Sequence, residues 1–225
     1  MIITMKKETL TQKRKRAQEI IGVLNELYSV AECTLDFNDP LQLLISTQLA
    51  AQCTDERVNN VTKTLYQKYR TVSDFAQANI IELEQEIKST GFFRNKARNI
   101  INCCKKIEAE FNGEIPNTME ELLSLPGVGR KTANVVLGDA FHVPGIVVDT
   151  HAGRLARRME LTKETDPEKV EFALMKIIPK ESWTRFGHQL VLHGRAVCNA
   201  RKPACSRCSV SPFCPKIDVT ENQKA

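Results

Sequence analysis

The stretch "LLSLPGVGRKTANVVLGDAF", residues 122–141, places a tight glycine turn between two apolar helical segments. The turn comprises Gly127, Val128 and Gly129, and the second helix begins near Arg130. Glycines permit positive φ angles and close approach by another backbone. The unpaired amides at the start of a helix carry partial positive charge, so the turn and the helix start together predict a cradle for a phosphate group. An ordinary helix-turn-helix corner would have the same outline.

Helical patterns continue along the chain and predict an all-α fold of roughly ten helices. Asp39 and Asp166 are each followed by a proline, which is typical of an N-cap residue and the first helical position. Asn112 and Gly113 form a typical helix stop. No alternating run that would indicate a strand exceeds about four residues.

The composition is that of a globular protein, since 42% of the 225 residues are apolar. This length holds one large domain or two small ones. No run approaches the length of a membrane span, and the N-terminus has no apolar segment ahead of a cleavage site. We therefore expect no membrane partner and a cytoplasmic location.

Basic residues gather near both ends of the chain, although the net charge is only +5. One zone runs from Val191 to Lys216 and contains no acidic residue; the other runs from Lys6 to Arg16 and contains only Glu8. Two such zones favour an anionic polymer as the partner. For the N-terminal zone alone, a solvated helix face is the simpler interpretation.

Half of the eight cysteines lie within residues 198–214, at Cys198, Cys205, Cys208 and Cys214. In a reducing compartment such a group is more typical of a metal site than of disulfides. Four thiolates suit zinc, and C-x2-C is a common half of a zinc site. They also suit an iron–sulfur cluster, although the spacing differs from the ferredoxin run. Spacing alone favours zinc.

Three motifs, in order, resemble the endonuclease III family of DNA glycosylases. "LPGVGRKTANVVL" resembles the DNA-binding helix-hairpin-helix, and "HVPGIVVDTHAGRLARR" resembles the Gly/Pro-rich loop that ends in a catalytic aspartate. The spacing C-x6-C-x2-C-x5-C resembles the [4Fe–4S] loop of the family. "LISTQLAAQCTDERVN" and "GFFRNKARNI" resemble the segments that face the lesion. The likeness covers about residues 25 to 216.

The resemblance implies a two-lobed, all-α helix-hairpin-helix glycosylase fold and a monomer. Residues 33–143 would form a six-helix barrel that includes the hairpin at about 118–141. Residues 1–32 and 144–225 would form the iron–sulfur domain, with its cluster loop at 198–214. Catalytic residues of the two lobes would face each other across a cleft.

By resemblance, Lys131 is the catalytic nucleophile and Asp149 the catalytic carboxylate. The first turn of a helix disfavours a cation, and a partly buried site would add to this, so a neutral, nucleophilic amine is favoured. Asp149 could accept a proton or stabilise positive charge at C1′. The plainer interpretations are a phosphate-contacting lysine and a helix N-cap.

The resemblance also implies which residues contact DNA. Gln52 and Phe92 match positions that fill the gap left by a flipped base, although an aliphatic residue is expected where Phe92 stands. A polar helix end and a core phenylalanine are the alternatives for these two. His151 would lie near the flipped nucleotide. Phosphates would meet the hairpin residues and three loop cations, namely Gly127, Val128, Gly129, Arg130, Arg201, Lys202 and Arg207.

The implied activity is cleavage of the N-glycosidic bond of a damaged base, an oxidised pyrimidine by family expectation, followed by β-elimination at the abasic site. The partner is double-stranded DNA, so a bacterial protein would associate with the nucleoid. The resemblance reverses the preference for zinc, and a [4Fe–4S] cluster becomes the expected cofactor. Two alternatives remain: a monofunctional glycosylase of the adenine-mismatch type that uses water, and a non-catalytic DNA-binding module.

Overall fold

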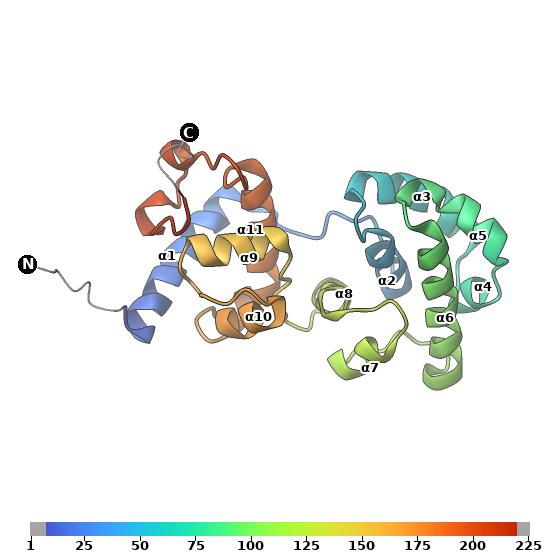
Figure 1. Cartoon of the computed structure of the whole chain (residues 1–225). Coiled ribbons are helices and arrows are strands. Elements are labelled where there is room, and N and C mark those ends of the chain that lie inside the picture. Colours follow the sequence, from blue (N-terminus) through green and yellow to red (C-terminus); the bar gives the residue numbers. More distant parts are fainter. Residues whose placement is uncertain (1–7, 220–225) are drawn as a thin grey trace, which may run out of the picture. The chain divides into compact units, whose positions relative to one another are not determined.

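The computed structural model describes residues 8–219, and over this range helices are the only regular secondary structure (Figure 1). The described chain divides into two compact units: residues 33–145 form one, and the segments before Cys33 and after Gly145 form the other. The expected all-α fold is confirmed. Two cations of the N-terminal basic zone, Lys6 and Lys7, lie outside the described residues. Within residues 8–219, no helix has both the length and the hydropathy needed to span a membrane.

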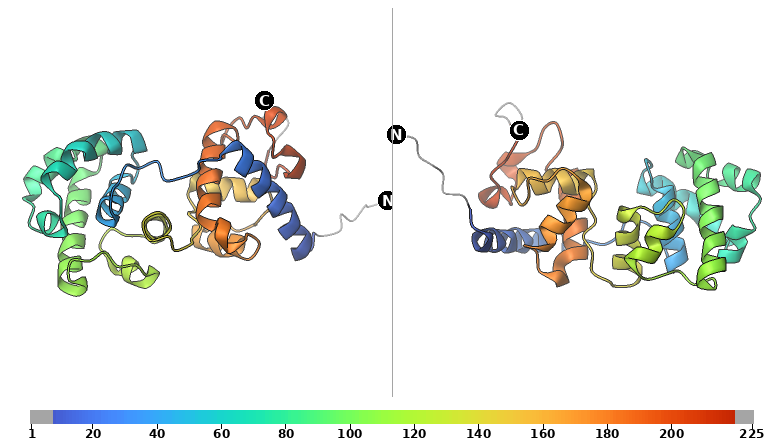
Figure 2. Two further views of the ribbon diagram at one scale, coloured as in Figure 1. Left: turned by 180° about the vertical axis from the view of Figure 1, so that it is seen from behind. Right: turned by 60° about the horizontal axis from the view of Figure 1, so that its bottom comes forward.

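The unit of residues 33–145 is built around the long helix α6, which packs against α4 and α5 (Figures 1 and 2). Helix α2 contacts α3, α6 and α8. The hairpin helices α7 and α8 contact each other, and a π-helical turn, Val136–Ala140, extends α8. The helices are α2 (Pro40–Leu49), α3 (Asp55–Lys68), α4 (Val72–Ala76), α5 (Ile80–Glu86), α6 (Phe93–Phe111), α7 (Met119–Ser124) and α8 (Arg130–Val135), with a 3-10 turn, η1 (Lys88–Thr90), before α6.

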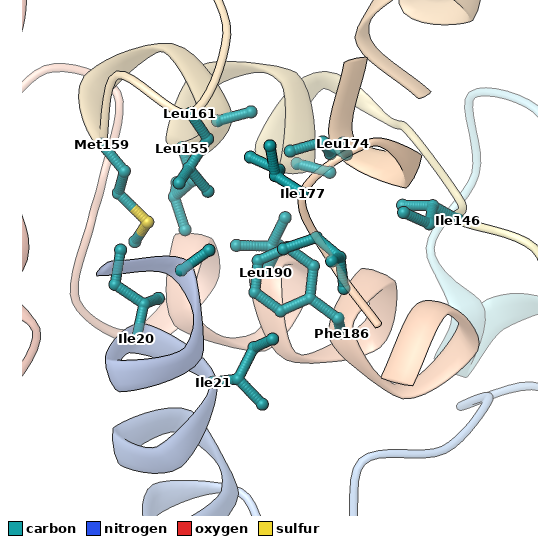
Figure 3. Packing of buried hydrophobic residues seen from close by; sticks show 14 of the residues in the cluster. Ile20, Ile21, Ile146, Leu155, Met159, Leu161, Leu174, Ile177, Phe186 and Leu190 are labelled. Atoms are coloured by element: carbon teal, nitrogen blue, oxygen red, sulfur yellow. The ribbon is translucent and has the colours of Figure 1, made fainter. Parts of the chain in front are cut away.

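The second unit packs an N-terminal helix onto three C-terminal ones (Figure 3). Ile20 and Ile21 of α1 lie against a cluster that includes Leu155 of α9, Leu174 of α10 and Phe186 of α11. The helices are α1 (Leu10–Leu27), α9 (Thr150–Arg158), α10 (Pro167–Met175) and α11 (Trp183–Ala196), with 3-10 turns at Lys180–Ser182, Cys205–Arg207 and Ser211–Phe213. This core supports the cysteine loop, because Cys198, Cys208 and Cys214 pack against it among other partly buried residues.

The predicted helix boundaries follow local capping chemistry. Asp39 caps α2 by accepting a hydrogen bond from the Gln42 amide at 2.8 Å. Asp166 caps α10 in the same way. Helix α6 ends at Asn112, which takes a left-handed φ of 52°, as expected for a residue at a helix stop.

The N-terminal basic zone is partly structural rather than free for DNA. Arg16 forms a bidentate ion pair with Glu8 and donates to the carbonyls of Met159, at 2.6 Å, and Phe213, at 3.1 Å. Arg14 donates to the Lys176 carbonyl at 3.0 Å. The Arg16 contacts fasten α1 to the end of α9 and to the cysteine loop, and the Arg14 contact fastens it to the end of α10, so both guanidinium groups serve folding.

Candidate functional site

Of the two glycines in the hairpin turn, Gly127 occupies the position that excludes other residues. Gly127 has a φ of 77°, and a Cβ there would lie 2.9 Å from both Asn99 Cβ and Gln48 Oε1. Any side chain would therefore strain the backbone and collide with α6 and α2. Gly129 is extended, with a φ of −100°, and a Cβ there would meet nothing within 4 Å. Gly129 is therefore not needed for a positive φ angle. The open space beside it lets a ligand approach the start of α8.

Val128 faces inward, which changes the role predicted for it. Its side chain is buried, and its amide donates to the Leu125 carbonyl at 3.2 Å. That amide is already hydrogen-bonded within the turn and is not spare for a phosphate. The remaining amides of the cradle belong to the glycines on either side and to the start of α8.

Lys131 stands in the first turn of α8 and is exposed. The partial burial expected from the sequence is thus not found, because Lys131 lies ahead of the buried part of α8, residues 133–135. Cys33 lies nearby. Burial raises the pKa of its thiol to about 12, and the charges of Asp139, Asp55 and Lys131 act on it as smaller effects. The sequence patterns did not single out Cys33, Asp55 or Asp139, since their proximity arises only on folding.

Asp149 is the N-cap of α9 and accepts a hydrogen bond from the Ala152 amide at 2.8 Å. The capping interpretation is therefore correct, and the carboxylate is held at a helix start and half-buried.

His151 lies two residues after Asp149, and its Nδ1 atom is 3.1 Å from Arg154 Nη2. A guanidinium can only donate, so Nδ1 is the acceptor and the imidazole proton lies on Nε2.

Gln52 and Phe92 both occupy left-handed backbone at exposed loop tips. Their φ angles are 54° and 49°, and Gln52 is exposed while Phe92 is 64% exposed. The alternative of a core phenylalanine is therefore wrong. A non-glycine residue in this region of φ and ψ costs about 1–3 kcal/mol and persists only where the surroundings enforce it. Both tips belong to the unit of residues 33–145.

The four loop cysteines line a single pocket together with Arg158, His193 and Val210. Each cysteine is half-buried. Arg158 Nη1 lies 3.4 Å from Cys198 Sγ, and His193 Nε2 lies 3.3 Å from Cys208 Sγ. Burial lowers the pKa of His193 to about 4, so its ring is neutral near pH 7 and presents one donor and one acceptor.

The backbone of the cysteine loop is held from α9, while its cations face solvent. Arg158 donates to the carbonyls of Asn199, at 2.8 Å, and Ala200, at 2.7 Å. Arg154 Nη2 donates to the Cys198 carbonyl at 2.9 Å. The three predicted phosphate-binding cations, Arg201, Lys202 and Arg207, lie on this loop and are exposed.

Known proteins resemble this chain over most of its length. A family model described as "HhH-GPD superfamily base excision DNA repair protein" matches residues 45–180. Endonuclease III of Synechocystis sp. is 53% identical over 212 residues, which cover 94% of this chain and 97% of the relative. Endonuclease III of Escherichia coli K12 is 40% identical over 210 residues, covering 92% and 99%. The cysteine loop lies beyond the range of the family model.

Solved structures of related proteins also resemble this chain over most of its length. A non-covalent complex of Endonuclease III with DNA matches with a TM-score of 0.86 and 43% identity, covering 90% of this chain and 95% of that one. A trapped covalent intermediate of Endonuclease III and DNA matches with the same score and identity, covering 90% and 96%. A thermostable thymine-DNA glycosylase has a TM-score of 0.81 at 22% identity and shares the fold.

Proposed function

This chain belongs to the HhH-GPD superfamily of base excision DNA repair proteins, and we propose that it releases damaged bases, oxidised pyrimidines in particular, from duplex DNA and then cleaves the abasic site. The observation that carries the proposal is the match, at 43% identity over 90% of the chain, to a trapped covalent intermediate of Endonuclease III and DNA. A covalent intermediate requires a nucleophile. We assign this role to Lys131 from the family resemblance, because its exposed amine lies directly after the hairpin turn.

In the proposed reaction the neutral amine of Lys131 attacks C1′ of the damaged nucleotide. The N–C1′ bond to lysine forms while the N-glycosidic bond breaks, and its electron pair leaves with the base. Opening of the sugar ring yields an imine, and loss of a proton from C2′ then expels the 3′ phosphate by β-elimination. Asp149 accepts the proton of the attacking amine or stabilises positive charge at C1′.

Trapping with borohydride tests this proposal directly. Wild-type protein is mixed with duplex DNA containing one abasic site, borohydride is added, and the DNA is analysed on a denaturing gel. A reduced imine leaves a stable protein–DNA adduct, and an oxidised-pyrimidine duplex should give the same adduct after base release. Base release without an adduct would point to water as the nucleophile, and binding without either product would leave only a DNA-binding module.

Phosphate binding is assigned to two places in the chain. The hairpin offers the amides of Gly127 and Gly129 and the start of α8, beside Arg130. The cysteine loop offers three exposed cations, Arg201, Lys202 and Arg207. Contacts of this kind position the protein on DNA without reading its sequence.

Replacing Arg201 with alanine tests the phosphate assignment. The variant should bind lesion-containing and undamaged duplex more weakly by the same factor, and the slope of log K against log salt should fall by about one unit. Fluorescence anisotropy at several salt concentrations measures both quantities. Lys163→Ala removes an exposed charge from the same unit and should leave the slope unchanged. Weaker binding of the lesion duplex alone would make Arg201 a recognition residue instead.

We further infer that the cysteine loop holds a [4Fe–4S] cluster. All four thiols line one pocket, and no carboxylate lines it with them. The four sulfurs therefore surround a common space. Four thiolates around a space fit a cluster in which each sulfur binds its own iron. Bound there, the cluster would order the loop and its cations.

The protein purified without oxygen should be brown and contain about four irons per chain. Cys205→Ser should lose iron and bind duplex DNA more weakly. The change removes one thiolate ligand of the cluster, and the cluster orders the loop that carries Arg201 and its neighbours. Cys53→Ser changes a cysteine outside the loop and should keep both iron and binding. Iron assay, visible absorbance and anisotropy give the measurements. Colourless protein with one zinc per chain would contradict the cluster.

A further inference from the structure

Lys96 is a buried lysine that joins two loops of the unit of residues 33–145. It lies in the first turn of α6 and is 6% exposed. Its ammonium group donates to the Leu49 carbonyl at 2.7 Å and to the Thr90 carbonyl at 2.8 Å. Leu49 is the last residue of α2 and Thr90 the last residue of η1, so one side chain binds the ends of two separate elements.

A lysine in this position is unfavourable for the local helix. A cation near a helix N-terminus opposes the helix dipole, and burial lowers the pKa of Lys96. Both acceptors are neutral carbonyls, which offset the desolvation of an ammonium group less than a carboxylate would. One compensation is that the Leu49 carbonyl lies at the negative end of the α2 dipole. A methionine would fill the same space without these costs, so the role of the charge lies in the two carbonyls that it holds.

The two carbonyls lie immediately before the two exposed loop tips. Gln52 follows Leu49 by three residues, and Phe92 follows Thr90 by two. Both tips are left-handed and exposed, a conformation that the surrounding structure must enforce. Through these two carbonyls the Lys96 side chain is bonded to the base of each loop.

We propose that Lys96 is a positioning residue that sets the spacing between the Gln52 and Phe92 tips, so that both can enter the duplex and fill the gap when a damaged base is extruded. The inference rests on the proposed function, because it assigns those tips to base extrusion. Lys96 itself does not touch DNA or the reacting atoms. Without its two hydrogen bonds, each loop relaxes separately, and misplacement of either tip by about 1 Å would cost up to 10²-fold in rate.

The test compares one protein on two substrates. The first is a duplex with thymine glycol paired to adenine; in the second, a tetrahydrofuran abasic analogue replaces that adenine, so the lesion has no pairing partner to leave. For Lys96→Met, single-turnover base release from the paired duplex should fall about tenfold or more, while release from the unpaired duplex should fall less than about threefold. The ratio of the two rates is independent of the fraction of active protein.

Three further variants sharpen the result. Lys105→Met removes a lysine from the same helix at an exposed position and should leave both rates unchanged. Gln52→Ala should show the same selective loss as Lys96→Met. The double variant should lose less than the product of the two single losses, because both act on one step.

An equal loss on both substrates for Lys96→Met, or no loss on either, would overturn the role of Lys96 while leaving the glycosylase intact. Absence of base release and trapping in the wild type would instead overturn the proposed function. Lys96→Gln covers the case in which Lys96→Met does not fold, since it keeps a polar donor in the buried site but removes the charge and shortens the side chain. A wild-type ratio in Lys96→Gln would then count against the inference.

Discussion

Replacing Lys131 with alanine is expected to reduce borohydride trapping on abasic duplex DNA to below about 1% of the wild-type yield, because the amine that forms the imine is gone. Strand cleavage should be lost to the same extent. Affinity for undamaged duplex should change by less than about threefold, because the hairpin amides and the exposed loop cations remain. Adduct yield on a denaturing gel and anisotropy with undamaged duplex measure the two effects.

Lys131→Arg separates the charge of this side chain from its chemistry. Arginine keeps a cation beside the hairpin but forms no imine, so it should bind DNA as the wild type does and still fail to trap. Trapping of Lys131→Ala at the wild-type rate would make another lysine the nucleophile. Full base release with loss of cleavage would show that water performs the first step.

The parts of the fold that the sequence predicted are those fixed by residues close together in the chain. The Asp39 and Asp166 caps, the Asn112 stop and the glycine turn each depend on neighbours within a few positions. Capping and positive φ are local chemistry, so the pattern indicates them directly. The family followed from three such motifs in order, and the comparisons confirm it.

The features that the sequence did not reveal depend on distant partners. Lys96 binds a carbonyl 47 positions away, and in the sequence it is one more cation on an amphipathic helix. In the sequence Arg16 is one cation of a basic zone, yet two of its carbonyl acceptors, Met159 and Phe213, lie more than a hundred residues along the chain. Val128 was expected to meet a phosphate, yet its side chain is buried, while Gly129 is extended and has open space beside it. Burial and open space depend on how the elements around the turn pack, which the local pattern does not indicate.

Replacing Asp149 with asparagine is expected to lower base release about 10²-fold or more, because the negative charge that accepts a proton or stabilises C1′ is lost. The fold should survive this change. Asparagine caps helices about as well as aspartate, so the hydrogen bond from the Ala152 amide, now 2.8 Å long, can persist. Single-turnover base release and the thermal unfolding midpoint provide the two measurements.

Asp166 supplies a matched control for the loss of an N-cap carboxylate. It caps α10 by accepting from the Lys169 amide at 3.0 Å, an arrangement like that of Asp149 on α9. Asp166→Asn should therefore shift the unfolding midpoint as little as Asp149→Asn does and leave base release at the wild-type rate. Asp149→Ala removes cap and charge together, and should add a loss of stability of about 0.5–2 kcal/mol to the loss of activity. If Asp149→Asn released bases at the wild-type rate and only Asp149→Ala were impaired, the carboxylate would be a helix cap and another group would carry the charge at C1′.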